Sequence, residues 1–307
     1  MEYQNQHHDV WNQFVSHSKN GVFLFMRDYM EYHSNRFADL SIMFRHNNLL
    51  ALMPANILND VVYSHGGLTF GGVVSDEHMK TSTMLEIFDA MKAYLRGQRV
   101  RRIVYKPVPH IYQSMPAQED LYALFVHNAQ LVRRDVSSAI FMSEKKPFQK
   151  KRRWSIKKSR QYGIEVKRSY DFRTFMGIEH AVLKEKYGTV PTHTADEIDL
   201  LANRFPDNIQ LFAAHKGDAM VAGVIIYNSK NVAHAQYIAA TDMGKKMYAV
   251  DMILDYLISE YCSDKKYFDF GISTTKEGRA LNAGLIAQKE EFGARAVVYD
   301  TYEIPVN

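Results

Sequence analysis

The sequence predicts an α/β (α+β) protein built from two tandem units, each with a mixed, mostly antiparallel sheet flanked by helices. Its 307 residues suffice for two domains of about 150 residues each, and 46% of them are apolar, which is enough for packed cores. A similar order of helices and strands occurs twice along the chain, which indicates a duplicated unit. We place the units at residues 1–145 and 146–307, with one large α/β domain as the alternative.

The first half predicts a pair of helices, then strands, and then alternating helices and strands. The helices are expected at residues 8–18, 27–33, 75–97 and 119–132. The strands are expected at residues 40–45, 49–55, 60–74, 100–108 and 136–142. Asn47-Asn48 joins the first two strands, because asparagine pairs are typical of tight turns.

The second half repeats this order with clearer signals. Its helices are expected at residues 147–162, 171–187, 195–205, 247–261 and 279–292. Its strands are expected at residues 164–169, 209–215, 221–228, 232–241, 266–272 and 296–304. Asp171 is the expected N-cap of the second helix, and Gly163 and Gly188 are expected to end the first two helices. Thr194 and Glu197 form a capping-box pattern before the third helix.

The composition favours a cytoplasmic protein. No apolar run approaches the roughly 20 residues that cross a bilayer, so we expect no transmembrane segment, and the first residues lack the pattern of a signal peptide. The one cysteine, Cys262, excludes an internal disulfide and a thiolate metal cluster. The 13 histidines lack the partner spacing of a metal site, so we expect no metal.

Basic charge is concentrated in one segment. Residues 145–160 hold nine Lys and Arg residues and no acid, although the net charge of the whole chain is only +4. Such a segment can meet the phosphates of a nucleotide, of CoA, of tRNA or of a membrane surface. Arg152 and Arg153 are therefore candidate substrate-binding residues, and an ordinary solvated helix face is the alternative.

Three stretches of the second half resemble one known family. Arg152-Arg153 and Lys157-Lys158 lead into Gly163-Ile164-Glu165-Val166, YFDFGIS is a buried strand that ends in a turn, and GLIAQKEEFG is a helix with a lysine before Phe-Gly. With the repeated element order, these stretches resemble the GNAT acyltransferase fold in tandem, as in the Fem-type aminoacyltransferases. The resemblance covers both units in arrangement and is specific over residues 145–168 and 232–302. It implies that the second unit is the catalytic one.

The resemblance implies a site where the fourth and fifth strands of a unit separate and admit an acyl donor. In the second unit these are the strands expected at 232–241 and 266–272. Strict alternation puts His234, Gln236 and Ile238 on one face of the fourth strand and Tyr237 on the other. His234 is the candidate general base, and Gln236 and Tyr237 are candidate substrate-binding residues. A buried, hydrogen-bonded histidine without a catalytic role is the alternative.

The helix after the fifth strand carries a second catalytic candidate, Lys289. In Fem-type proteins the corresponding lysine contacts a phosphate of the acceptor or steadies developing charge, and the resemblance implies the same role for Lys289. Asn282 lies two helical turns earlier on the same face, so it is a candidate substrate-binding residue. The alternative is a surface lysine that offsets Glu290 and Glu291.

The acyl donor stays open between acyl-CoA, such as acetyl-CoA, and aminoacyl-tRNA, each a co-substrate rather than a permanently bound cofactor. GNAT proteins that bind CoA usually carry a compact glycine-rich turn whose N–H groups bind pyrophosphate at a helix N-terminus. The stretch ATDMGKKMYAVD, residues 240–251, lacks that turn. Gly244, Lys245 and Lys246 are therefore candidate donor-binding residues, with a solvated turn as the alternative.

Candidates for binding the acceptor come mainly from the first unit. Tyr63 and His65 lie in a glycine-rich stretch, where the backbone can approach a ligand closely or simply bend. Lys106 ends a strand, the place where open α/β sheets bind ligands, although the prolines around it can also stiffen a turn. His193, in the second unit, precedes a helix start and is either a cleft residue or solvent-facing.

These features predict an N-acyltransferase that moves an acetyl or aminoacyl group to an amine of a sugar-, peptide- or nucleotide-linked cell-envelope precursor. The expected partner is a small-molecule or nucleotide-linked acceptor, and tRNA and a peripheral membrane surface are further candidates. The alternative is a non-catalytic module that binds RNA or a phosphorylated ligand through residues 145–160. A third hypothesis is that the first unit only supports the second.

Overall fold

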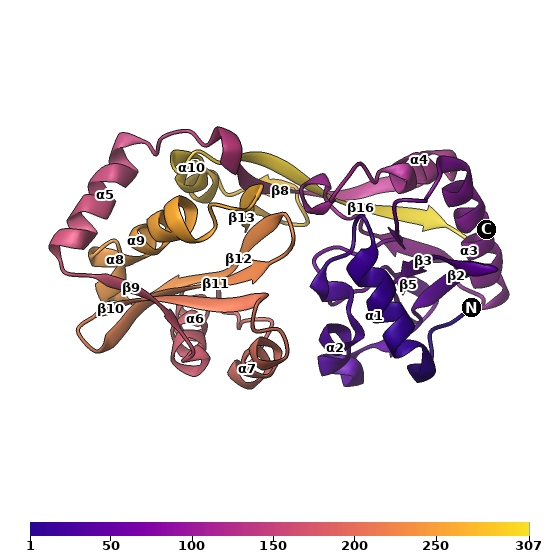
Figure 1. The fold of residues 1–307 in the computed structure, drawn as a ribbon, viewed down its shortest axis with the longest axis horizontal. Helices are drawn as coiled ribbons and strands as arrows, with labels where there is room; N and C mark the ends of the chain where they lie inside the picture. Colours follow the sequence, from indigo (N-terminus) through magenta and orange to yellow (C-terminus); the bar gives the residue numbers. More distant parts are fainter. Residues whose placement is uncertain (307) are drawn as a thin grey trace. The chain divides into compact units, whose positions relative to one another are not determined.

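The computed structural model describes residues 1–306, which fold as two compact units (Figure 1). Unit 1 comprises Met1–Val136, Thr274–Leu281 and the chain from Val297 onward, and unit 2 comprises Ser137–Ser273 and Asn282–Ala296. The chain therefore crosses between the units four times, whereas the sequence predicted one boundary after residue 145. Two of the crossings lie within long strands, β8 (Gln130–Phe141) and β16 (Arg295–Pro305), and the other two flank Thr274–Leu281.

Unit 1 combines a larger and a smaller sheet with helices. The larger sheet follows the order β1–β4–β5–β7–β16, and the smaller follows β2–β3–β6. The strands are β1 (Ala38–Asp39), β2 (Ile42–His46), β3 (Asn48–Met53), β4 (Asn56–Leu58), β5 (Val61–Tyr63), β6 (Val74–Ser75), β7 (Arg102–Tyr105), and a separate hairpin of β14 (Thr274–Thr275) and β15 (Ala280–Leu281). The α-helices are α1 (His8–His17), α2 (Arg27–Met30), α3 (Thr81–Gly97) and α4 (Glu119–Val126). Pairing in both sheets is antiparallel except between β5 and β7.

The core of unit 1 forms where α3 packs on the sheets. The helix buries Met84, Phe88, Met91 and Leu95 at the spacing of one helical face. The helix predicted at residues 119–132 is wrong at its end. Helix α4 ends at Val126, and β8 begins at Gln130 after a short turn. Asn128 there has a φ of 56°, a left-handed conformation that asparagine tolerates and that breaks a helix.

Unit 2 is a six-stranded sheet with helices on both faces. The strands follow the order β8–β13–β12–β11–β10–β9, and only β12 and β13 pair in parallel. The strands besides β8 are β9 (Glu165–Ser169), β10 (Ile209–Lys216), β11 (Ala219–Asn228), β12 (Val232–Ala240) and β13 (Tyr267–Ile272). The α-helices are α5 (Lys150–Gln161), α6 (Phe172–Tyr187), α7 (Ala195–Arg204), α8 (Asp242–Lys246), α9 (Ala249–Tyr256) and α10 (Ala283–Glu291). Figure 1 shows α5 and α9 on one face of this sheet and α6 and α7 on the other.

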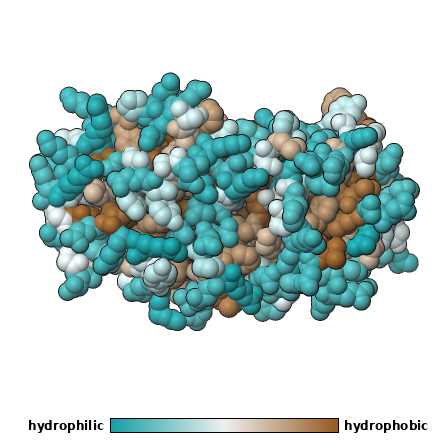
Figure 2. Space-filling model, viewed as in Figure 1, coloured by the Kyte–Doolittle hydropathy of each residue, from teal (hydrophilic) through white to brown (hydrophobic). Residues whose placement is uncertain are grey.

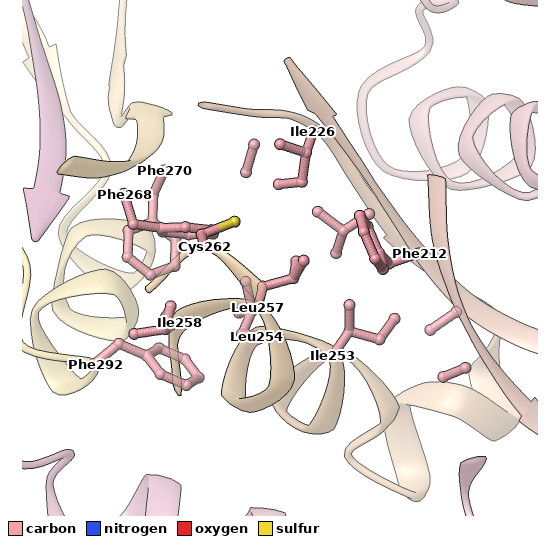
Figure 3. Close-up of a cluster of buried hydrophobic side chains, with 14 of the residues drawn as sticks. Phe212, Ile226, Ile253, Leu254, Leu257, Ile258, Cys262, Phe268, Phe270 and Phe292 are labelled. Atoms are coloured by element: carbon pink, nitrogen blue, oxygen red, sulfur yellow. The ribbon is translucent and has the colours of Figure 1, made fainter. Parts of the chain in front are cut away.

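A large apolar cluster of unit 2 surrounds α9 and the π-helical turn Leu257–Tyr261 that follows it. In Figure 3, Leu254 and Leu257 lie between Phe212 and Ile226 of the sheet on one side and the aromatic side chains near β13 and α10 on the other. Those aromatic side chains are Phe268, Phe270 and Phe292. Cys262 is buried in the same cluster, and burial raises the pKa of its thiol to about 12, so it acts as a packing residue.

The predicted helix ends of unit 2 are confirmed at several positions. The Asp171 side chain accepts a hydrogen bond from the Thr174 backbone at 2.9 Å, and Gly188 ends α6 with a φ of 64°. Thr194 and Glu197 form both bonds of the capping box. The helix predicted at 247–261 begins two residues later, at Ala249, because Tyr248 takes a left-handed φ of 56° and separates α8 from α9. It ends at Tyr261 as predicted, with its last turn π-helical.

A β-bulge changes which side chains of β12 share a face. His234 lies opposite Tyr227 and Tyr237 lies opposite Ile225, so Gln236 is the extra residue between them. Directly opposed residues of antiparallel strands share a face, so His234 and Tyr237 lie on one face and Ile238 lies on the other. The predicted face of His234, Gln236 and Ile238 is therefore wrong, because strict alternation assumes a regular ladder.

The surface of the described residues is mostly polar. Figure 2 shows hydrophilic residues over much of one face of the molecule, with smaller apolar areas between them. Among the helices within residues 1–306, none has both the length and the apolar character to cross a membrane.

Candidate active site

The sheet of unit 2 separates between β12 and β13. The two strands pair over only three residue pairs, of which the last is His234 with Asp269. Beyond it, β12 continues to Ala240, whereas β13 bends at Gly271, whose φ of 75° favours glycine. The edge of β12 from Ala235 onward therefore has no strand partner on this side in the part of the chain that the structure describes.

A hydrogen-bonded row of Ser137, Asp269 and His234 lies at the point of separation. Nδ1 of His234 is 2.8 Å from Oδ2 of Asp269, and the Ser137 hydroxyl donates to Oδ1 of the same carboxylate at 2.5 Å. The Asp269 side chain is fully buried, whereas 14% of the His234 side chain is exposed. In the neutral tautomer whose Nδ1–H donates to Asp269, Nε2 is an acceptor, as a general base requires.

Lys289 ties α10 to the end of β13. Its buried ammonium donates to the carbonyl oxygens of Gly271 at 2.7 Å and Ile272 at 2.9 Å. Burial lowers the pKa of Lys289 to about 8, and the negative charge of Asp269 opposes this shift. An ammonium has three N–H donors, so one remains for a ligand.

A cavity of about 390 Å³ lies beside the unpaired edge of β12. Every residue that lines it belongs to unit 2. The lining comprises Arg152, Val182, Lys186, Ile238–Ala240, Gly244, Lys245, Tyr248–Asp251, Leu254, Phe270, Leu285, Gln288, Lys289 and Phe292. These walls combine apolar side chains with several lysines, so the cavity suits a ligand that has an apolar arm and anionic groups.

Arg152 joins α5 to α9 and α10. Its guanidinium contacts both carboxylate oxygens of Asp251, at 3.0 and 2.8 Å, and one oxygen of Glu291 at 2.6 Å. It also lies over the ring of Phe292, 5.4 Å from the centroid. The structure thus gives this predicted substrate-binding residue internal partners, whereas Arg153 next to it is exposed.

Comparisons with known proteins identify related folds for unit 2 and for the whole chain. Residues 146–277 match the family model of the acetyltransferase (GNAT) domain. The crystal structure of FemX has a TM-score of 0.67 at 12% identity, with 98% of this chain and 96% of FemX covered. The chain has a tandem GNAT-like fold.

Two further structures have the same fold. L-PGS from Bacillus licheniformis has a TM-score of 0.62 at 10% identity, with 100% of this chain and 93% of that chain covered. A tandem GNAT protein from the clavulanic acid biosynthesis pathway has a TM-score of 0.51 at 8% identity, with 89% of this chain and 86% of that chain covered. No curated protein matches the sequence. At these identities the likeness is one of fold.

In this GNAT-fold protein the turn after β12 is built for packing. A Cβ on Gly244 would lie 2.1 Å from the Val221 carbonyl oxygen, so glycine is required for α8 to approach β11. Lys245 lines the cavity and pairs with Asp242 at 2.9 Å. Lys246 is exposed and is not part of the lining. Of the three predicted donor-binding residues, only Lys245 thus presents a charge to the cavity.

Three further candidates in unit 2 have defined places. The His193 ring lies 2.6 Å from the Tyr237 hydroxyl, measured from Nδ1, and both residues are buried. Burial raises the pKa of Tyr237 to about 12, so its hydroxyl stays neutral at physiological pH. Asn282 is the N-cap of α10, and its side chain accepts from the Leu285 backbone at 3.1 Å. The amide oxygen of Asn282 is thus used in the cap.

The three candidates from unit 1 lie close together. Tyr63 ends β5 beside β7, and the Lys106 backbone donates to the Ser64 hydroxyl at 2.8 Å. His65 is buried with a φ of 61°, and burial lowers its pKa to about 3. The Lys106 ammonium donates to the Leu68 carbonyl, and burial lowers its pKa to about 8. The neutral imidazole of His65 and the Lys106 ammonium, which loses its proton more readily than usual, thus lie in one region of unit 1.

Three polar residues of unit 2 were missed by the sequence reasoning. Asp269 stands between two phenylalanines in a buried strand, and a carboxylate there is itself a signal of function or of a buried network. Ser137 supports it. Glu179 occupies a core position of α6, where the helical pattern calls for an apolar residue. Within residues 1–306, no group of three or more His, Cys, Asp or Glu side chains is placed to hold a metal.

Replacing Lys289 with methionine should lower the free energy of unfolding by about 1–3 kcal/mol, because two carbonyls at the end of β13 lose their donor. Urea unfolding measures this change. Lys245→Met is the matched control, since Lys245 is exposed and should change stability by less than about 0.5 kcal/mol. Equal stability of the two variants would show that Lys289 does not hold the end of β13.

Proposed function

We propose that this protein is an N-acyltransferase, in which the amine of an acceptor attacks the carbonyl carbon of an acyl donor. The observation that supports this most is the separation of β12 from β13 beside a cavity of about 390 Å³. A donor in that cavity meets the unpaired edge of β12, whose backbone groups can bind an extended amide-containing arm as an added strand. The fold likeness to FemX supports the same reading.

Acyl-CoA is the first donor to test and aminoacyl-tRNA is the second. Ile238 and Leu285 offer apolar contacts to an acyl arm, and Lys186 and Lys245 offer positive charge to phosphates. Either donor would act as a co-substrate. The acceptor that we propose is an amine of a sugar-, peptide- or nucleotide-linked cell-envelope precursor, met in the cytoplasm or at the membrane surface.

The proposed chemistry needs one base and one stabiliser of negative charge. The amine nitrogen bonds to the carbonyl carbon, Nε2 of His234 takes a proton from that nitrogen, and the bond to sulfur or ester oxygen breaks. The leaving group then takes up the proton from His234. Asp269 orients the imidazole at 2.8 Å, and the third N–H of Lys289 is available to the developing oxyanion.

Acetyl-CoA binding and turnover test this function. We expect acetyl-CoA to raise the melting temperature, and free CoA to be released when an amine panel of amino sugars and peptides is added. Leu285→Trp should abolish binding by filling the cavity, whereas Leu281→Trp, an exposed residue outside the lining, should not. If neither acetyl-CoA nor aminoacyl-tRNA binds, and no amine accepts an acyl group, the proposal fails.

A non-catalytic binder of RNA or of a phosphorylated ligand remains the second candidate. The observation that favours it is the outer side of α5, where Arg153 and Lys157 are exposed and Trp154 is half exposed. Basic residues bind phosphates, and an aromatic ring can stack on a base. Steeply salt-dependent tRNA binding without any acyl transfer would favour this candidate over the transferase.

A further inference from the structure

The inward stripe of α6 contains one carboxylate. Phe172, Phe175 and Met176 are buried against the sheet, and Glu179 follows at the next position of the same stripe. Glu179 is only 7% exposed. A helix that packs on a sheet gains stability from apolar residues at such positions, so a glutamate there costs stability unless it meets a ligand or a partner.

The protein itself supplies no cation to this carboxylate. Burial alone raises the pKa of Glu179 to about 7, and no hydrogen bond or neighbouring charge within residues 1–306 contributes to that shift. Its polar neighbour is Tyr237, because the charge of Glu179 adds to the rise in the pKa of that hydroxyl. Tyr237 in turn bonds to His193 at 2.6 Å. Glu179 is therefore a buried carboxyl group that has no cationic partner among the described residues.

Glu179 belongs to the helical stripe of α6 that reaches the cavity beside β12. Val182 and Lys186, which line the cavity, follow Glu179 by three and seven residues and so belong to the same stripe of α6. On β12, Tyr237 directly precedes Ile238, which also lines the cavity. The bulge at Gln236 places Tyr237 on the same face as His234. The carboxylate thus lies near Tyr237, on the face of β12 that carries the proposed base, and one turn before the first α6 residue of the cavity lining.

We infer that Glu179 binds the positively charged amine of the acceptor, with Tyr237 and His193 as its polar surroundings. This inference rests on the proposed N-acyltransferase function and specifies its acceptor as a primary alkylamine, which binds as its ammonium ion and releases one proton to water before the neutral nitrogen attacks. An ammonium supplies the opposite charge that the carboxylate lacks, and it donates hydrogen bonds that a neutral hydroxyl acceptor supplies more weakly. The selectivity for amines over alcohols then follows from the desolvated carboxylate.

Butylammonium chloride is the probe, with butanol and sodium chloride as controls, measured by calorimetric titration at pH 8. We expect the wild-type protein to bind butylammonium and not butanol, and Glu179→Gln to bind it about tenfold more weakly or not at all. Glu185→Gln, on the exposed side of the same helix, should bind as the wild type does. Equal binding by the wild type and Glu179→Gln, or no binding by the wild type, would overturn the inference.

A parallel titration with acetyl-CoA separates this inference from the proposed function. Glu179→Gln should keep acetyl-CoA binding, which also reports that the variant is folded. If acetyl-CoA binds and releases CoA with an amine equally well in both proteins, the transferase stands and the amine site is wrong. If butylammonium binds through Glu179 but neither acyl donor binds, the amine site stands and the transferase is wrong.

Discussion

Methionine in place of Arg152 should lower the free energy of unfolding by about 3–5 kcal/mol, because it leaves buried negative charge without its cationic partner. Asp251, only 4% exposed, would lose its cationic partner, and Glu291 would keep only Lys151 at 3.5 Å. Methionine preserves helix propensity and most of the side-chain volume. The loss, measured by urea unfolding, therefore reports the ion pairs rather than packing.

The next residue provides the control for this prediction. Arg153→Met removes the same charge from the exposed side of α5 and should change stability by less than about 0.5 kcal/mol. Replacing Arg152 and Asp251 together should lower the free energy of unfolding by less than the sum of the two single losses, because no unpaired carboxylate of Asp251 then remains. Additive losses would mean that the two residues do not act as a pair.

Asparagine in place of His234 should reduce acyl transfer by about 10²–10⁴-fold, the usual contribution of a general base. Acetyl-CoA binding should not change, since His234 does not line the cavity. Asp269→Asn should also slow transfer, because an amide in place of the carboxylate no longer fixes the imidazole tautomer whose Nε2 accepts a proton. Release of free CoA in the presence of an accepted amine measures each rate.

An exposed histidine serves as the control for His234. His180→Asn, on the outer side of α6, should transfer at the wild-type rate. Transfer by His234→Asn within about threefold of the wild-type rate would assign the proton to another acceptor.

The fold was predictable where the start or end of an element depends only on residues close to it in the sequence. The caps at Asp171 and Thr194 and the helix end at Gly188 each depend on residues within a few positions, and all three are confirmed. The end of α4 and the break at Tyr248 were missed, because each is set by one left-handed residue inside an otherwise helical pattern. The tandem GNAT-like arrangement was recovered from element order alone, since that order repeats.

The candidate site was predictable in part for a similar reason. His234 and Lys289 belong to the two elements that flank the separated strands, and the structure brings both near Asp269. The internal partners of Arg152 come from helices 99 and 139 residues away, so no local pattern reveals them. The bulge at Gln236 depends on the register with β11, which a strand's own sequence does not contain.

The exchange of strands between the units has a consequence for synthesis on the ribosome. Domains usually fold in order as they emerge, the N-terminal one first. Here β7 of unit 1 pairs with Tyr302–Pro305 of β16, so unit 1 must wait for a segment that is made after all of unit 2. The growing chain therefore carries an unfinished sheet edge until residue 305, and we expect the two units to reach their native state together.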